Sequence, residues 1–148
     1  MSRSKQQLNR DNLGFLLARA SQAWNEMLHS GFTKAGFGHV RPSYGAILVP
    51  LFEEDGLRLG ELARRAHLSK QAMTTMVRLL ERAKLVRRQA DQEDARAVRV
   101  FLTKHARQFE PVAEKVLAAV DAQIRACSPH QDTEIVRAWL KRFSGITN

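Results

Sequence analysis

Residues 60–103 of the chain are GELARRAHLSKQAMTTMVRLLERAKLVRRQADQEDARAVRVFLT, a pattern typical of two short helices, a tight turn and a two-stranded ribbon. Ser69 is well placed as the N-cap of the second helix, because its hydroxyl can accept a hydrogen bond from the first turn. That helix therefore begins near Lys70. Only His67 and Leu68 remain for the turn, so the two helices must cross steeply, as in a helix-turn-helix. The first helix buries three side chains, Leu62, Ala63 and Ala66.

The second helix is predicted to be strongly amphipathic. At about 3.6 residues per turn, its polar side chains gather on one stripe. This polar stripe consists of Gln71, Thr74, Thr75, Arg78 and Arg82. The opposite face is apolar and can rest on a core while the polar stripe stays available to a partner. The apolar face consists of Met73, Met76, Val77 and Leu80.

The ribbon follows directly, with strands expected over residues 85–89 and 98–102. The second strand alternates apolar side chains with Arg99 and Phe101, which is typical of a strand with one buried face. The intervening sequence ADQEDARA, residues 90–97, is predicted to form a wing, and Thr103 to cap the next helix.

The positive charge of the chain is concentrated on this region. Residues 58–107 contain 13 Lys or Arg and 5 Asp or Glu, a net of +8, out of +9 for the whole chain. A solvated basic surface would explain any charge run taken alone. On a helix-turn-helix with a wing, contact with DNA phosphates explains it better, because neutralised phosphates release counterions and so favour binding.

Long amphipathic helices are expected on both sides of the winged region. Residues 11–30 carry apolar side chains at steps of three and four, and a shorter helix is expected from Pro42 through Leu48, with Pro50 complicating its end. A further helix is predicted over residues 104–126, with Pro111 as a kink or early-turn residue. Ser128 is expected to cap the last helix, with Pro129 at its first position.

The terminal helices, residues 11–30 and 104–145, have more apolar surface than one small winged module is expected to bury. They either complete the core of the monomer or form a dimer. We favour a two-fold dimer, because it would place two recognition helices roughly 34 Å apart on one face of a palindromic DNA site.

The ordered motifs GELARRA, LSKQAMTT, LLERAKLVRR and DQEDARAVRVFLT resemble the MarR family of winged helix-turn-helix regulators over residues 42–103. Asp94 and Arg96 stand at the Asp-x-Arg signature of the family's wing. The resemblance implies one MarR-type domain over residues 1–148, mainly α with a small β wing, that dimerises through its first and last helices. Lys84 departs from the family's usual Gly, so it must either tolerate positive φ or end the helix differently.

Roles in DNA binding follow from side-chain chemistry. Gln71 suits adenine, Arg78 suits guanine, and Thr74 and Thr75 can bond to base edges or touch a thymine methyl. Ser69 and Lys70 are expected at phosphate beside the helix N-terminus, and Arg96 in a narrow minor groove. The wing acids Asp91, Glu93 and Asp94 are expected to be structural. The remaining expected DNA contacts are Arg41, Ser43, Arg82, Arg87, Arg88 and Arg99.

A transcriptional regulator must respond to a signal. The resemblance implies that a small aromatic or phenolic ligand binds and causes release of the DNA. The implied pocket lies near Trp24, Met27, His39, Arg41 and Tyr44. Each of these side chains could equally be plain core or loop. The family's redox branch uses a cysteine in the first helix, which this chain lacks, so Cys127 is expected to be a buried or interfacial side chain.

Composition narrows the remaining classes. The 148 residues with 44% hydrophobic content fit one domain, and no targeting or membrane segment is expected, so the protein is predicted to be cytoplasmic. One cysteine fits a reducing compartment. No enzyme motif, cofactor loop or metal-ligand cluster occurs, and Cys127 with His130 gives only two ligands.

Three functions from different classes stay open at this point. The first is a homodimeric, sequence-specific transcriptional repressor released by a small ligand. The second is an architectural nucleic-acid-binding protein with little sequence preference, and the third is a winged-helix module that binds an acidic protein. The ratio of specific to random affinity, typically about 10³ to 10⁷ for a regulator, separates the first two.

Overall fold

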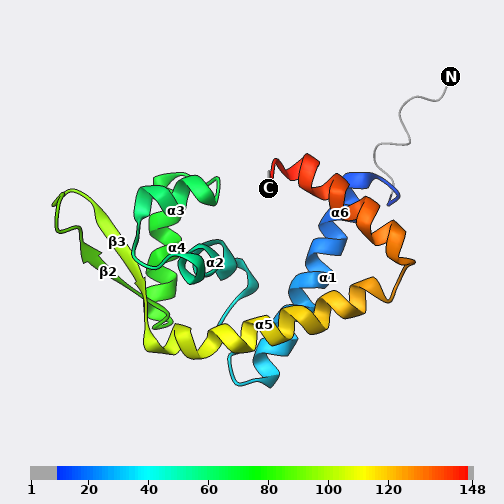
Figure 1. Ribbon diagram of the computed structural model, residues 1–148, viewed down its shortest axis with the longest axis horizontal. Helices are drawn as coiled ribbons and strands as arrows, with labels where there is room; N and C mark the ends of the chain where they lie inside the picture. The colour runs from blue at the N-terminus through cyan, green and yellow to red at the C-terminus, as the bar shows by residue number, and fades with distance from the viewer. Residues whose placement is uncertain (1–9, 147–148) are drawn as a thin grey trace.

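The computed structural model describes residues 10–146, and over this range the chain forms two lobes joined by one long helix (Figure 1). The winged lobe contains α2–α4 and the three strands, whereas α1 crosses the middle of α5 and α6 follows the far end of α5. The elements are α1 Leu13–Lys34, the 3-10 turn η1 Pro42–Tyr44, α2 Gly45–Glu53, β1 Leu57–Arg58, α3 Leu59–Arg65, α4 Lys70–Arg82, β2 Val86–Ala90, β3 Val98–Leu102, α5 Lys104–Arg125 and α6 His130–Ser144. The predicted fold class is confirmed. The predicted domain limits, residues 1 and 148, and most of the N-terminal segment lie outside the described residues.

The recognition helix α4 begins as predicted. The Ser69 hydroxyl accepts a hydrogen bond from the Ala72 N–H at 3.1 Å, and the helix starts at Lys70. Met73, Val77 and Leu80 are almost completely buried. Burial of each such side chain contributes about 2 kcal/mol, so the apolar face fixes the rotation of α4 in the lobe.

The sheet contains one strand that the sequence did not reveal. β2 and β3 form the expected antiparallel ribbon, with Val86 opposite Leu102, and β1 pairs with the other edge of β3, with Leu57 opposite Val100. β1 has only two residues, too few to show an alternating pattern. It attaches the wing to the start of α3, because Arg58 is also the N-cap residue of α3.

Lys84 has a φ of 59°, so it tolerates the left-handed conformation and does not end the helix differently. The N–H of Leu85 donates to the Leu80 carbonyl at 2.9 Å, and the N–H of Lys84 donates to the Glu81 carbonyl at 2.9 Å. These two bonds form the Schellman cap that normally has Gly at this position. His67, with a φ of 54°, ends α3 in the same way. The turn that ends α3 and the turn that ends α4 therefore each contain a non-glycine residue in the left-handed conformation.

The prolines and one cap differ from expectation. Pro50 lies inside α2, which continues to Glu53, and Pro111 lies inside α5 instead of in its first turn. Each proline removes only one backbone hydrogen bond of its helix. Ser128 was wrongly predicted as the cap of the last helix: the N-cap is Pro129, whose side chain accepts no capping hydrogen bond, and α6 begins at His130. The first helix extends to Lys34, beyond the predicted residue 30.

The terminal helices leave an extensive apolar surface uncovered, as predicted from their sequences. α1 packs closely on α5 near Gly31, where an added Cβ would lie 2.5 Å from Val116. In contrast, α6 buries no residue. The large side chains of these helices that remain exposed are Leu13, Phe15, Leu16, Trp24, Leu117, Ile124, Ile135, Val136, Leu140 and Phe143.

We expect Lys84→Gly to stabilise the protein. The left-handed conformation disfavours a side chain by about 1–2 kcal/mol, and glycine's greater loss of backbone entropy offsets about 0.5–1 kcal/mol of that. The free energy of unfolding in urea should therefore rise by about 0.5–1 kcal/mol. Lys84→Ala is the matched control, since it removes the charge and keeps the strain. Equal stability of the two variants would contradict strain at this position.

Candidate nucleic-acid interface

The polar stripe of α4 faces away from the core. Gln71, Thr75, Arg78 and Arg82 are exposed, and Thr74 is half-buried. The Thr74 hydroxyl donates to the Lys70 carbonyl at 2.8 Å, and the Thr75 hydroxyl donates to the Gln71 carbonyl at 3.1 Å. Their protons are therefore occupied, so toward a base each threonine offers an acceptor oxygen and a methyl group.

The tip of the wing is held by its own acidic residues. The Asp94 carboxylate accepts a hydrogen bond from the Arg96 N–H at 3.0 Å, and the Asp94 carbonyl accepts one from the Ala97 N–H at 3.0 Å. These bonds fix the turn from which the exposed Arg96 side chain projects. Asp94 thus shapes the wing, as predicted, and its charge does not argue against DNA binding.

Asp91 joins the base of the wing to the rest of the lobe. Its side chain is 2% exposed and binds Arg58 Nε at 2.6 Å and Arg99 Nε at 3.2 Å. The N–H of Glu93 also donates to it, at 3.0 Å. That backbone hydrogen bond, followed by the pairing with Arg58, keeps the pKa of Asp91 below its ordinary value. The structural role expected for Asp91 is confirmed.

A groove of about 560 Å³ separates the wing from the helix-turn-helix. Arg58, Lys70 and Arg96 bring three cations to its walls, together with Glu61 and Asp94. Gly60 lies beside Lys70, and the groove is open to solvent. Arg58 was not among the predicted sites. Only its pairing in β1 brings it to the wing, and no sequence pattern marks that strand.

The remaining arginines of the ribbon differ in their partners within the chain. Arg87 lies 4.6 Å over the Phe101 ring and donates to Gln89, which orients an exposed guanidinium. Arg88 pairs with Glu81 of α4. Arg99 binds Asp91 and donates to the Gly56 carbonyl at 2.8 Å. Arg99 therefore helps to hold the wing, and its contact with phosphate stays a prediction.

An ion cluster ties α3 to the end of α2. Glu61 binds Arg64 and Arg65 in successive positions of α3, and Arg65 also binds Glu54 at 2.9 Å. Hydrogen bonds from Arg64, then from Arg65, lower the pKa of Glu61 from 4.5 to about 2. The carboxylate is therefore charged wherever the protein is folded under ordinary conditions.

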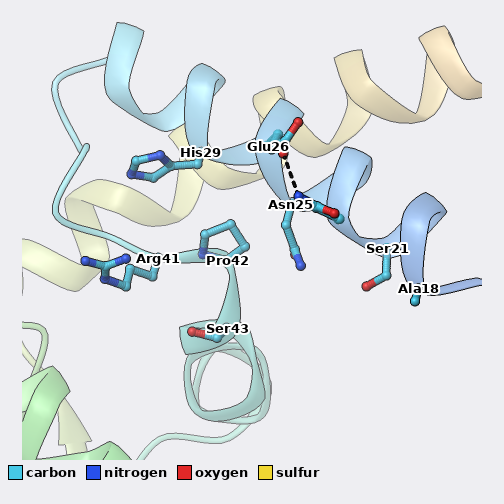
Figure 2. A pocket seen from close by; sticks show the side chains of 9 residues that line it. Ala18, Ser21, Asn25, Glu26, His29, Arg41, Pro42 and Ser43 are labelled. Carbon is cyan, nitrogen blue, oxygen red and sulfur yellow. Dashed lines mark hydrogen bonds between the residues drawn. The ribbon is translucent and has the colours of Figure 1, made fainter.

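Arg41 and Ser43, whose contact with DNA stays a prediction, lie directly before and within η1. Both line a second groove of about 590 Å³, between the start of α2 and α1 (Figure 2). Across it lie Ser21 and Asn25 of α1, and His29 closes one end by bonding the Gly38 carbonyl at 2.9 Å. Neither Arg41 nor Ser43 lines the groove beside the wing.

The five side chains of the implied ligand pocket are not all brought together. Trp24 and Arg41 line one apolar cavity of about 90 Å³ among α1, α2 and α5. Met27 lines a different groove, between α1 and α5, and Tyr44 is core, with 8% exposure. His39 Nε2 lies 2.7 Å from His105 Nε2. The sequence missed most of the apolar walls of this cavity, namely Leu28, Phe32, Val40, Leu48, Val49, Phe52, Phe109 and Leu117.

Within residues 10–146, no group of three or more His, Cys, Asp or Glu is placed to hold a metal ion. Cys127 is exposed in the chain, which excludes the expectation that it is buried within the monomer and leaves the interfacial one. None of the helices over this range is long and apolar enough to cross a membrane.

The fold and the basic groove define a winged helix-turn-helix protein, and the comparisons with known proteins agree. The model of the MarR family matches residues 42–98. The HTH-type transcriptional repressor Rv2887 of Mycobacterium tuberculosis is 32% identical over 121 residues, covering 80% of this chain and 85% of that protein. The chain therefore belongs to the MarR family, and its relatives are transcriptional regulators, not enzymes.

Solved structures show the same fold. A probable transcriptional regulator from Pseudomonas aeruginosa has a TM-score of 0.78 at 26% identity, covering 90% of this chain and 97% of that one. The repressor CouR bound to a 23-mer DNA duplex has a TM-score of 0.77 at 20% identity, covering 89% and 92%. CouR from Rhodococcus jostii RHA1 has also been solved with p-coumaroyl-CoA, with a TM-score of 0.71 at 22% identity, covering 93% and 95%.

Acid should destabilise the protein through Glu61. A carboxylate whose folded pKa lies below its ordinary value stabilises the fold fully above that ordinary value, 4.5, and loses this effect as pH falls toward about 2. Stability in urea, measured from pH 7 to pH 2, should therefore fall over this window, and less steeply in Glu61→Gln. Glu53→Gln, at the exposed end of α2, is the control. If the stability of wild type and of Glu61→Gln falls in parallel as pH decreases, Glu61 does not cause the loss of stability in acid.

Proposed function

We propose that the protein is a homodimeric, sequence-specific transcriptional repressor that binds a palindromic operator and leaves it when a small aromatic ligand binds. One observation carries the proposal: the polar stripe of α4 and the cations beside the wing belong to one lobe, and α5 connects that lobe to helices with uncovered apolar faces. The proposed DNA-binding surface and the proposed dimer surface thus belong to different parts of the molecule. The protein would act in the cytoplasm, where its DNA lies.

The contacts with DNA divide by groove. α4 would enter the major groove, where Gln71 suits adenine, Arg78 suits guanine, and Thr74 and Thr75 accept hydrogen bonds from exocyclic amines. Ser69 and Lys70 would bind phosphate at the N-terminus of α4. Arg96 would enter the adjacent minor groove from the tip of the wing. The remaining phosphate contacts would come from Arg82, Arg87, Arg58, Arg88 and Arg99. The last three also bind Asp91 or Glu81, and their side chains are 38–44% exposed.

Dimerisation would cover the apolar faces of α1, α5 and α6. α6 is the strongest reason to expect a dimer. None of its residues is buried within the chain, and a helix without tertiary packing gains little stability from folding alone. Trp139 and Phe143 of α6 stack with centroids 5.3 Å apart and present a flat aromatic surface. A two-fold axis through these helices would set two α4 helices one turn of DNA apart.

The ligand would occupy the cavity beside Trp24 and Arg41. Its volume of about 90 Å³ suits one aromatic ring, and the guanidinium of Arg41 at its edge suits a carboxylate. The cavity lies among α1, α2 and α5, where the two lobes meet. A ligand there would change how the winged lobe sits on the dimer helices. CouR, a structural relative, has been solved with an aromatic acyl compound, p-coumaroyl-CoA.

DNA binding can be measured by fluorescence anisotropy on the protein's own upstream DNA and on a scrambled duplex. The upstream duplex should bind at least about 10³ times more tightly, and affinity should fall steeply with salt. Arg96→Ala should weaken specific binding about 10-fold or more, since loss of one specific contact costs about 1–3 kcal/mol. Arg19→Ala, which removes the same charge from α1, should leave affinity unchanged.

Other results of this experiment would point to the other functions. Equal affinity for both duplexes would favour an architectural protein. Absence of binding to any duplex at low salt, including duplexes selected from a random library, would favour a module that binds an acidic protein.

Ligand binding can be followed by the fluorescence of Trp24 in a Trp139→Phe background, with benzoate and 4-hydroxycinnamate as probes. A bound ring should change this fluorescence and release the operator. Arg41→Ala should weaken binding about 10-fold or more, since a hydrogen bond to a charged group contributes about 1.5–3 kcal/mol. Arg41→Lys keeps the charge as a control. If Arg41→Ala binds both acids as wild type does, the carboxylate is not recognised there.

A further inference from the structure

Leu79 of α4 is an exposed apolar side chain that the functions described so far do not explain. It is 42% exposed. Elsewhere in residues 10–146, the large exposed hydrophobic side chains lie on α1, on α5 or along and just after α6, with the exception of Val49. Val49 lines the apolar cavity. Leu79 is therefore left on the winged lobe with neither a dimer helix nor a cavity to account for it.

Leu79 borders the polar stripe of α4. It follows Thr75 by four residues and precedes Arg82 by three, so its side chain is a direct neighbour of both on the helix surface. The buried face of α4, formed by Met73, Val77 and Leu80, points to the other side. Any ligand that covers Thr75 and Arg82 therefore also covers Leu79.

The chemistry of the major groove supplies one apolar group that matches this side chain. Each A·T pair presents the C5-methyl group of thymine there, which is the one methyl group among the hydrogen-bond donors and acceptors of the base edges. Arg78 and Arg82 flank Leu79 with positive charge, which favours a polyanion over an apolar protein surface at this position.

We propose that Leu79 contacts a thymine methyl group in each half-site and so selects an A·T pair at one position of the operator. This inference rests on the proposed DNA binding. The contact adds discrimination of a kind that Gln71 and Arg78 do not supply, because it depends on an apolar group and not on a hydrogen bond. It also extends the apolar surface beyond the single methyl group that Thr74 and Thr75 each present. Leu79 is thus a specificity-determining residue beside the polar stripe.

The test uses the full-length protein and a duplex selected by it from a random-sequence library. Each symmetric pair of thymines in the selected site is replaced by deoxyuridine, which lacks only the methyl group. One such pair should weaken wild-type binding by about 4-fold per half-site, or about 10- to 20-fold for both, as expected for burial of one methyl group in each. The same replacement should change the affinity of Leu79→Ala by less than about 2-fold.

Leu79→Met serves as the matched control, since it keeps an apolar side chain of similar volume and should retain the sensitivity to deoxyuridine. Circular dichroism and light scattering check that each variant has the wild-type fold and mass. The proposal is overturned if Leu79→Ala shows the same deoxyuridine profile as wild type, or if its molecular mass changes, which would make Leu79 a protein contact. If the wild-type chain selects no sequence at all, DNA binding itself fails, and this inference with it.

Discussion

Everything that the winged lobe presents depends on the burial of one face of α4. Met73, Val77 and Leu80 are withdrawn almost entirely from water, and each contributes about 2 kcal/mol to holding the helix in place. A rotation of α4 about its own axis would move the polar stripe and expose these three side chains to water. The hydrophobic effect, which carries no information about DNA, thereby sets which side chains α4 presents to solvent.

The wing depends on a different interaction, because a two-stranded ribbon with a charged tip has little apolar surface to bury. Its position is set instead by Asp91, which is nearly buried and receives Arg58 from β1 and Arg99 from β3. Removing one partner of such a group leaves a buried charge unsatisfied, so the network is maintained as a unit. Asp91 and Asp94 are thus part of the frame of the wing, whereas the exposed Arg96 lies at its tip and the exposed Lys70 lies along the groove.

Several elements could be predicted from the sequence because their signals are local. The cap at Ser69, the period of α4 and the alternation in β3 each involve residues close in the chain, and the wing and its Asp94 turn follow from them. The strand β1, the Arg58–Asp91 pair and the cavity walls could not be predicted, because each joins residues more than thirty positions apart. Arg99 illustrates the difference: its residue type suggests phosphate, and only the fold reveals that Asp91 already binds it. The ligand pocket implied by the family resemblance agrees least with the structure, because of its five side chains only Trp24 and Arg41 line the same cavity.

The unbroken course of α5 gives the molecule a mechanical property. With 22 residues at about 1.5 Å each, this helix is a rod about 33 Å long whose first turn follows the wing and whose last turn lies beside α6. A tilt of about 10° at one end of such a rod moves the other end by about 6 Å, which exceeds the rise of about 3.4 Å between base pairs. If α4 enters the major groove as proposed, a small tilt of α5 would therefore be enough to shift α4 relative to the base pairs.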